Sequence, residues 1–182
     1  MEFLIVHWLP ILVATIALWF LSFFAWVLMS HHFGDFNKLD AEDEVMDVVR
    51  NAKIPAGNYM FPYSGSNKEQ STKAYQQRYL EGPRGTLNVY DVPNMGINMS
   101  LTILYFLITA TTIAYITNFA CPADDGSSDF MRVFRVAGTI GVLTYASSGV
   151  LHRIWFKARI WTDMLDGLVY GLVLGLIFAW LW

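Results

Sequence analysis

Long apolar stretches are the feature of this sequence that most restricts its fold. A bilayer core of roughly 30 Å is crossed by a helix of about 20 apolar residues. Stretches of about this length recur along the chain and are separated by polar segments. They occupy residues 3–29, 97–119, 133–152 and 164–182. The sequence therefore predicts an all-α membrane protein with four transmembrane helices.

The four stretches are not equally strong. The first has no basic leader and no small-residue cleavage site after it, so we interpret it as a permanent anchor and not as a cleaved signal peptide. The third is the weakest, because only residues 136–151 separate Arg135 from His152. If that helix crosses the membrane, Arg132 and Arg135 must extend their charged ends to the interface.

Composition excludes several classes of protein. Charged residues make up 15% of the chain and hydrophobic residues 55%, whereas average soluble domains are about a quarter charged. A water-soluble globule and a nucleic-acid binder with a basic patch are both excluded. Cys121 is the only cysteine, which excludes an internal disulfide, a redox pair and a thiolate metal cage. The expected partners are the lipid bilayer and other membrane protein subunits, with no nucleic acid.

A polar insert covers residues 31–96, between the first and second apolar stretches. Apolar residues at helical spacing predict a short helix over 39–51. A capping-box pattern followed by Gly-Pro predicts a second helix over 66–82. Strand-like pieces at 58–61 and 86–92 flank that helix and give the region the size of a βαβ unit. We expect a small α/β insert that leans on the membrane helices or on a partner.

Lysine and arginine set the expected orientation. The insert and the link between the third and fourth helices are rich in both, whereas the link at 120–130 is acidic. The sequence predicts that the insert and the 3–4 link face the cytoplasm and that both termini face outside. The residues behind this prediction are Lys38, Arg50, Lys53, Lys68, Lys73, Arg78 and Arg84 in the insert, Arg153, Lys157 and Arg159 in the 3–4 link, and Asp124, Asp125 and Asp129 in the acidic link.

Three short motifs resemble a family of small bacterial inner-membrane proteins. They are Gly57-Asn58-Tyr59-Met60-Phe61-Pro62-Tyr63, Glu81-Gly82-Pro83-Arg84-Gly85-Thr86-Leu87 and Pro93-Asn94-Met95-Gly96. The resemblance covers most of the chain, from the end of the first helix through the fourth. It implies a multi-helix protein of the bacterial inner (plasma) membrane, and it brings no established activity or ligand.

Glycines one helical turn apart mark the strongest packing motif. Gly167, Gly171 and Gly175 lie along the fourth helix, and Gly138 and Gly141 lie along the third. Such grooves let another backbone approach closely. We expect the third and fourth helices to pack together through them; the alternative is that the groove receives the helix of a partner protein or a lipid.

Three histidines are expected near the cytoplasmic interface, at the ends of the first and third helices. His31, His32 and His152 could together hold a metal ion, a haem or a quinone, with Asp35 or Asp163 as the carboxylate partner. Against this, adjacent residues on a continuous helix point about 100° apart. A ligand role is therefore the less favoured interpretation of His31 and His32.

Asp163 and Asp166 lie one turn apart at the start of the fourth helix. The helix dipole and the preceding basic link explain carboxylates at this position. The alternative is an ion or proton relay through Asp166, because buried acids in membranes are often functional. Asp, Glu, Lys and Arg are absent from the middle third of every predicted helix, which argues against ion-coupled transport.

The predicted function is that of a non-enzymatic accessory or scaffolding subunit of a larger membrane complex. No nucleophile elbow, P-loop, dinucleotide fingerprint or zinc-protease motif is present in the sequence, so we assign no catalytic residue and predict no cofactor. Two alternatives stay open. The first is a membrane protein that binds a metal, haem, quinone or other small ligand through the interfacial histidines, and the second is a small transporter or channel.

Overall fold

The structure is a computed structural model that describes residues 2–122, 129–156 and 159–182. The chain forms two compact units: residues 1–37 with 95–182, and residues 38–94. Three residues of the topology prediction, Asp124, Asp125 and Lys157, lie outside the described residues.

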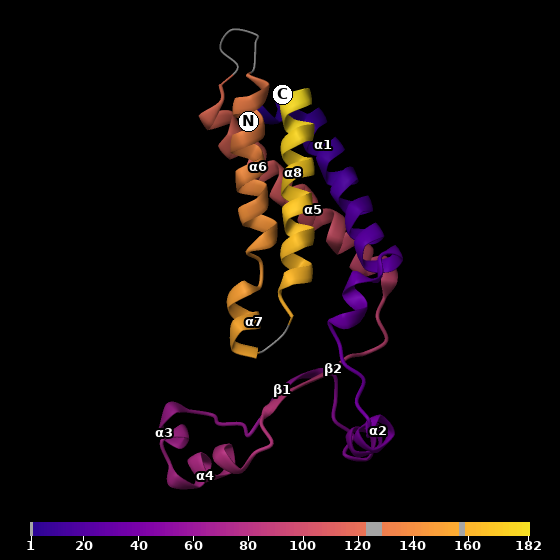
Figure 1. Cartoon of the computed structure of the whole chain (residues 1–182), viewed down its shortest axis with the longest axis vertical. Helices are drawn as coiled ribbons and strands as arrows, with labels where there is room; N and C mark the ends of the chain where they lie inside the picture. Colours follow the sequence, from indigo (N-terminus) through magenta and orange to yellow (C-terminus); the bar gives the residue numbers. More distant parts are fainter. Residues whose placement is uncertain (1, 123–128, 157–158) are drawn as a thin grey trace. The chain divides into compact units, whose positions relative to one another are not determined.

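The first unit is a bundle of long helices. Helix α6 lies alongside α8, and α1 packs against both α8 and α5 (Figure 1). Helix α1 begins, and α8 ends, at the same end of the bundle. The helices are α1 (Glu2–Phe23), the π-helical turn η1 (Phe24–Leu28), the 3₁₀ turn η2 (Ser30–Gly34), α5 (Met95–Ala120), α6 (Phe130–Ala146), α7 (Val150–Phe156) and α8 (Trp161–Leu181).

Three of these helices are long and apolar enough to cross a membrane: Phe3–Leu28, Met95–Ala120 and Trp161–Leu181. Their outward faces carry many large apolar side chains, such as Ile5 and Phe119, which are 77% and 75% exposed. A soluble protein rarely exposes apolar surface on this scale, whereas lipid tails would cover it. The fold, mostly helical with three candidate membrane spans, is consistent with a membrane protein.

The third predicted helix is not continuous. Helix α6 ends at Ala146 and α7 begins at Val150, so the single helix expected over 133–152 is broken. Gly149, between them, has φ +77°, a left-handed conformation that interrupts a helix and that glycine adopts without steric cost. The shortened α6 is not among the three helices that meet the length for a span within the described residues.

Helices α6 and α8 approach closely because glycines face the contact. A Cβ added to Gly171 would lie 2.6 Å from Val142 Cα, and one added to Gly175 would lie 2.7 Å from Gly138 Cα. Ordinary van der Waals contact begins near 3.4 Å. Side chains at these positions would therefore force the two backbones apart.

Helix α1 is kinked near its start. Pro10 lies inside the helix, and His7, three residues earlier, has the non-helical dihedrals φ −107° and ψ 18°. Proline removes a backbone donor and its ring crowds the preceding turn, which distorts the helix on its N-terminal side.

The second unit is built on a two-stranded sheet. Strands β1 (Gly57–Phe61) and β2 (Gly85–Val89) are antiparallel, with Gly57 opposite Val89 and Phe61 opposite Gly85. A βαβ unit would make them parallel, so that prediction is wrong. The helices of this unit are α2 (Glu42–Asn51), α3 (Asn67–Gln70) and α4 (Lys73–Glu81).

The helix expected over 66–82 is divided into α3 and α4. Ser66 caps α3, where its side chain accepts a hydrogen bond from the Glu69 amide at 3.2 Å. Thr72 then caps α4 by accepting from the Tyr75 amide at 3.3 Å. Both caps use a hydroxyl to satisfy amides that lack a partner at a helix start. Gly82, with φ +68°, ends α4.

Candidate metal centre

The chain changes conformation where α1 ends, and this change brings two histidines together. After the π-helical turn η1, Met29 is extended, with φ −88° and ψ 141°, and the 3₁₀ turn η2 follows. His31 and His32 in this turn have ring centroids 4.2 Å apart. The sequence argument against a shared ligand role was that His31 and His32 would point about 100° apart on a continuous helix. That argument is wrong, because the helix ends before them.

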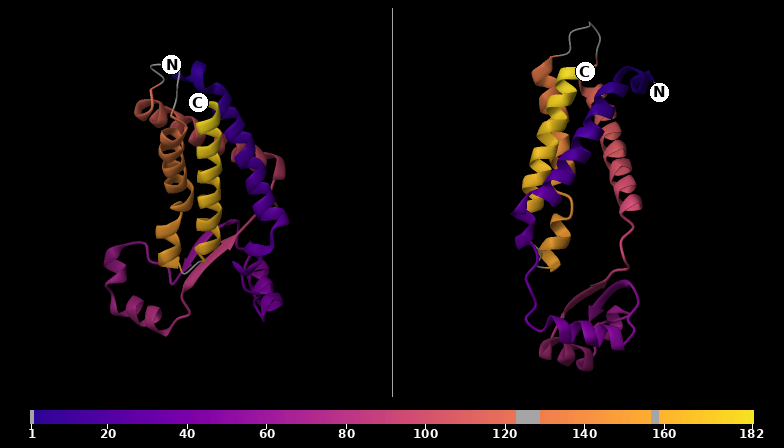
Figure 2. Two further views of the ribbon diagram at one scale, coloured as in Figure 1. Left: turned by 45° about the horizontal axis from the view of Figure 1, so that its top comes forward. Right: turned by 90° about the vertical axis from the view of Figure 1, so that its right-hand side faces the viewer.

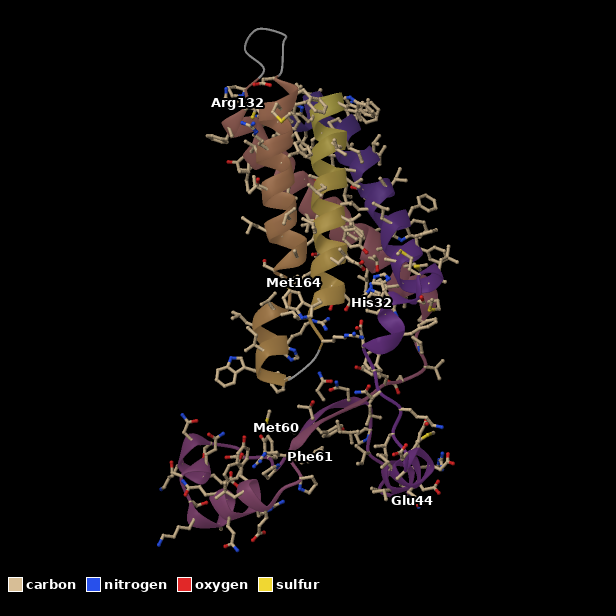
Figure 3. The ribbon with its side chains drawn as sticks, viewed as in Figure 1. His32, Glu44, Met60, Phe61, Arg132 and Met164 are labelled. Carbon is tan, nitrogen blue, oxygen red and sulfur yellow. The ribbon has the colours of Figure 1, made fainter. Side chains whose placement is uncertain are left out.

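Both histidines contact the same carboxylate. His31 Nε2 lies 2.9 Å from Asp166 Oδ1, and His32 Nε2 lies 3.0 Å from Asp166 Oδ2. Asp166 is in the second turn of α8, and Figure 3 shows His32 at the same end of the bundle as Met164 of that helix. His32 is 5% exposed and Asp166 is 8% exposed. The cluster is therefore largely shielded by the surrounding side chains.

A second layer of contacts orients His32. Its Nδ1 lies 2.6 Å from Asp35 Oδ2. The Thr162 hydroxyl donates to Asp35 Oδ1 and Oδ2, at 3.0 and 3.1 Å. The Trp26 ring stacks on the His32 ring, with centroids 3.9 Å apart and planes at 9°. These contacts hold the imidazole on both of its nitrogens and on one face.

The charges in the cluster act on each other. Burial lowers the pKa of His32, but hydrogen bonds from its ring to Asp166 and Asp35 and the charges of the two carboxylates outweigh burial, so the pKa lies above its usual value. Burial raises the pKa of Asp35, but the hydrogen bonds from His32 and Thr162 outweigh it, so that pKa lies below its usual value. Both shifts favour the charged pair.

The three side chains have the composition of a metal site. One ligand atom from each of His31, His32 and Asp166 lies within 4.8 Å of the others. Two imidazoles with one carboxylate are a ligand set that zinc and non-haem iron use, with further coordination positions left open. The Asp35 contact to Nδ1 is the outer-shell hydrogen bond that usually orients a metal-binding histidine.

The remaining candidate residues lie outside this cluster. His152, in α7, stacks on Phe156 with ring centroids 4.4 Å apart. Asp163 forms an ion pair with Arg153, which also donates to the Arg159 carbonyl at 2.6 Å. The structural explanation offered for both acids, pairing with the basic link, therefore describes Asp163 but not Asp166.

The glycines of α8 face α6 and not an open surface. A Cβ on Gly167 would lie 2.5 Å from the carbonyl carbon of Tyr145, and one on Gly141 would lie 2.9 Å from Gly171 Cα. Gly138 is less tight, with its nearest neighbours at 3.8 Å. The groove that could have received a partner helix is occupied by α6.

A separate polar cluster lies at the other end of the bundle. His7 is 1% exposed; its Nε2 lies 3.1 Å from Asn118 Oδ1, and its ring stacks on Trp182 with centroids 3.7 Å apart. Trp182 Nε1 donates to the Cys121 carbonyl at 3.2 Å. Figure 3 shows Arg132 at this end, and its guanidinium donates to the Ala120 carbonyl at 2.6 Å.

Sequence reasoning missed three residues around the candidate metal centre. Tyr170 donates to Asp166 Oδ2 at 3.4 Å, and its position one turn after Asp166 was a signal that could have revealed it. Thr162 and Trp26 carry no such signal, because their contacts depend on how the end of α1 folds against α8.

Comparison of the chain with protein-family models, with curated proteins and with solved structures gave no match.

Proposed function

We propose that this protein binds a divalent first-row transition-metal ion through His31, His32 and Asp166, at one end of a bundle of membrane helices. The observation that carries the proposal is the convergence of both Nε2 atoms on the two oxygens of one shielded carboxylate. Imidazole nitrogens favour zinc, iron, cobalt and nickel over magnesium and calcium, which prefer oxygen ligands.

The surroundings support a preorganised site. Asp35 holds His32 Nδ1, so the remaining nitrogen of that ring is directed at Asp166. Replacing a proton between Nε2 and the carboxylate by a metal ion leaves this outer contact intact. Because three protein ligands leave coordination positions open, the ion could also bind water or a substrate.

The same contacts also tie the end of α1 to α8, and a tie of this kind needs no metal. Metal binding separates the two explanations. The protein is purified in mild detergent, stripped with a chelator and titrated with Zn²⁺, and affinity is measured by competition with a chromogenic chelator. Co²⁺ serves as a second probe, because its visible spectrum reports coordination by nitrogen and oxygen.

We expect one ion per chain. Asp166→Asn and His32→Gln should weaken binding by more than the roughly 10–100-fold typical for loss of an outer-shell partner. His31→Gln is the milder ligand variant, because its side chain is 20% exposed, and it keeps the test informative if a buried variant does not fold. His152→Gln is the matched control and should bind as the wild type does. Binding that all three ligand variants retain, or no binding by the wild type, would overturn the proposal.

The accessory-subunit hypothesis has less support from the geometry. Its main motif, the glycine groove of α8, packs against α6. A transporter acting through Asp166 has no specific observation in its favour, since that carboxylate is engaged by two histidines and Tyr170.

We further propose that α6 crosses the membrane beside α8, which makes four spans in the bacterial inner membrane with the polar insert inside and both termini outside. The supporting observation is that α6 packs against α8 through glycines spaced over several turns. Cysteines introduced at Ser66 in the insert and at Gly126 in the acidic link test the orientation. An impermeant thiol reagent added to intact cells should label Gly126→Cys and leave Ser66→Cys unlabelled; the reverse result would invert the topology.

A further inference from the structure

We propose that the bundle holds a second site, which binds a lipid-soluble hydroquinone (quinol) headgroup. A cavity of about 390 Å³ lies between α5, α6 and α8, within the size range of small-molecule pockets. It reaches Asp166, and so it adjoins the proposed metal site, but the quinol site does not depend on a bound metal.

Aromatic rings form the apolar part of the cavity. Phe106 of α5 and Tyr170 of α8 have ring centroids 6.0 Å apart at 90°, and Tyr145 of α6 and Tyr170 have centroids 6.1 Å apart at 81°. Tyr105 and Trp26 also line the space. Edge-to-face rings of this kind favour a flat aromatic guest. Figure 2 shows α5 diverging from α6 and α8 towards its N-terminal end.

The polar part of the cavity is rich in hydrogen-bond acceptors. The Thr109 hydroxyl donates to the carbonyls of Tyr105 and Phe106, at 2.9 and 3.1 Å. The Thr109 and Tyr145 hydroxyls also lie 2.8 Å apart, and either of the two can be the donor in that contact. Whichever of the two hydroxyls donates, the Tyr145 oxygen keeps the capacity to accept a further hydrogen bond.

Tyr170 repeats this arrangement on α8. Its hydroxyl donates to Asp166 Oδ2 at 3.4 Å, so the oxygen of this lining residue retains the capacity to accept. The carboxylates of Asp163 and Asp166 line the same space. Among the described residues that line the cavity, Arg153 carries the positive charge, and its guanidinium is engaged by Asp163 and by the Arg159 carbonyl.

A ligand that matches both the apolar and the polar part of the cavity is an aromatic ring that carries hydroxyl donors. A quinol has this chemistry. The corresponding quinone offers only carbonyl acceptors, which cannot pair with the carboxylates of Asp163 and Asp166 in the lining. A site that pairs with hydroxyl protons favours a ligand that carries them over an analogue that lacks them.

The test compares three probes that differ only in the headgroup: decylubiquinol, decylubiquinone and the bis-O-methyl ether of the quinol. Each is titrated into chelator-stripped protein in mild detergent, and the saturable rise in unfolding temperature gives an apparent affinity. We expect the quinol to bind about tenfold more tightly than the quinone or the ether, the difference expected for one unmatched hydrogen bond. Equal shifts from all three probes, or from decanol alone, would mean that the cavity only admits alkyl chains.

Two variants locate the effect. Ser148→Trp places a large ring in the cavity from an exposed turn, and it should abolish the quinol-specific shift. Leu151→Trp adds the same side chain at a position that is 76% exposed and outside the cavity lining, and it should leave the shift unchanged. Tyr145→Phe keeps the ring, and it should weaken quinol binding while leaving binding of the ether unaffected.

Retention of the quinol preference by both Ser148→Trp and Tyr145→Phe would refute the proposal. Because the titration uses protein without metal, failure of quinol binding and failure of Zn²⁺ binding are separate results.

Discussion

The substitution Gly171→Ala tests whether close backbone approach holds α6 and α8 together. The added Cβ would lie 2.6 Å from both Cα and Cγ2 of Val142. Normal contact begins near 3.4 Å, so α8 must move away by roughly 1 Å, and dispersion contacts along the helix pair are lost as it does. The neighbours are mostly backbone atoms, which cannot rotate out of the way.

Overpacking of this kind typically costs about 1–3 kcal/mol. We expect Gly171→Ala to fall in the upper half of that range, because α6 and α8 share the most extensive contact of any pair of helices in the described parts of the chain. The free energy of unfolding is measured by titration with SDS in mixed micelles, using tryptophan fluorescence and circular dichroism as independent probes.

Gly138→Ala is the matched control. It adds the same methyl group to the facing helix, but its Cβ would meet its nearest neighbours at 3.8 Å, an ordinary contact. We expect a change within about 0.5 kcal/mol. Equal destabilisation by the two substitutions would show that loss of glycine, and not the distance between the backbones, explains the effect, and the packing argument would fail.

Three further outcomes follow from single contacts. Asp35→Asn keeps the ligands but weakens the acceptor at His32 Nδ1, so Zn²⁺ affinity measured by chelator competition should fall roughly 10–100-fold. Asn118→Ala leaves the buried Nε2 of His7 without its partner, and SDS titration should show a loss of about 1–3 kcal/mol. Gly149→Ala forces a side chain into a left-handed conformation, and the same titration should show a loss of about 1–2 kcal/mol.

Much of the fold could be predicted from hydropathy, because lipid imposes a length and an apolar composition on any helix that crosses it. The first, second and fourth apolar stretches correspond to α1 with η1, to α5 and to α8. The third prediction failed at Gly149, because apolar composition does not reveal a left-handed residue. The resemblance to small bacterial inner-membrane proteins stays a prediction.

The structure of the polar insert was also only partly predictable from the sequence. Local hydrogen bonding fixed the helix starts at Ser66 and Thr72, and the first of these was visible in the sequence as a capping box. The direction of strand pairing was not visible, because a two-stranded pairing depends on how the chain between the strands turns back.

The amino-acid sequence by itself identified three helices that are long and apolar enough to cross a membrane. It named His31 and His32 as possible ligands together with His152, and it named Asp166 only as a possible ion or proton relay. It could not bring them together, since they are far apart in the chain. Tertiary structure decided the grouping: α1 ends before the histidines, the next turn changes their directions, and glycines let α8 pack closely beside α6 with Asp166 facing them. Proximity of this kind depends on how the helices pack, and a hydropathy profile does not predict it.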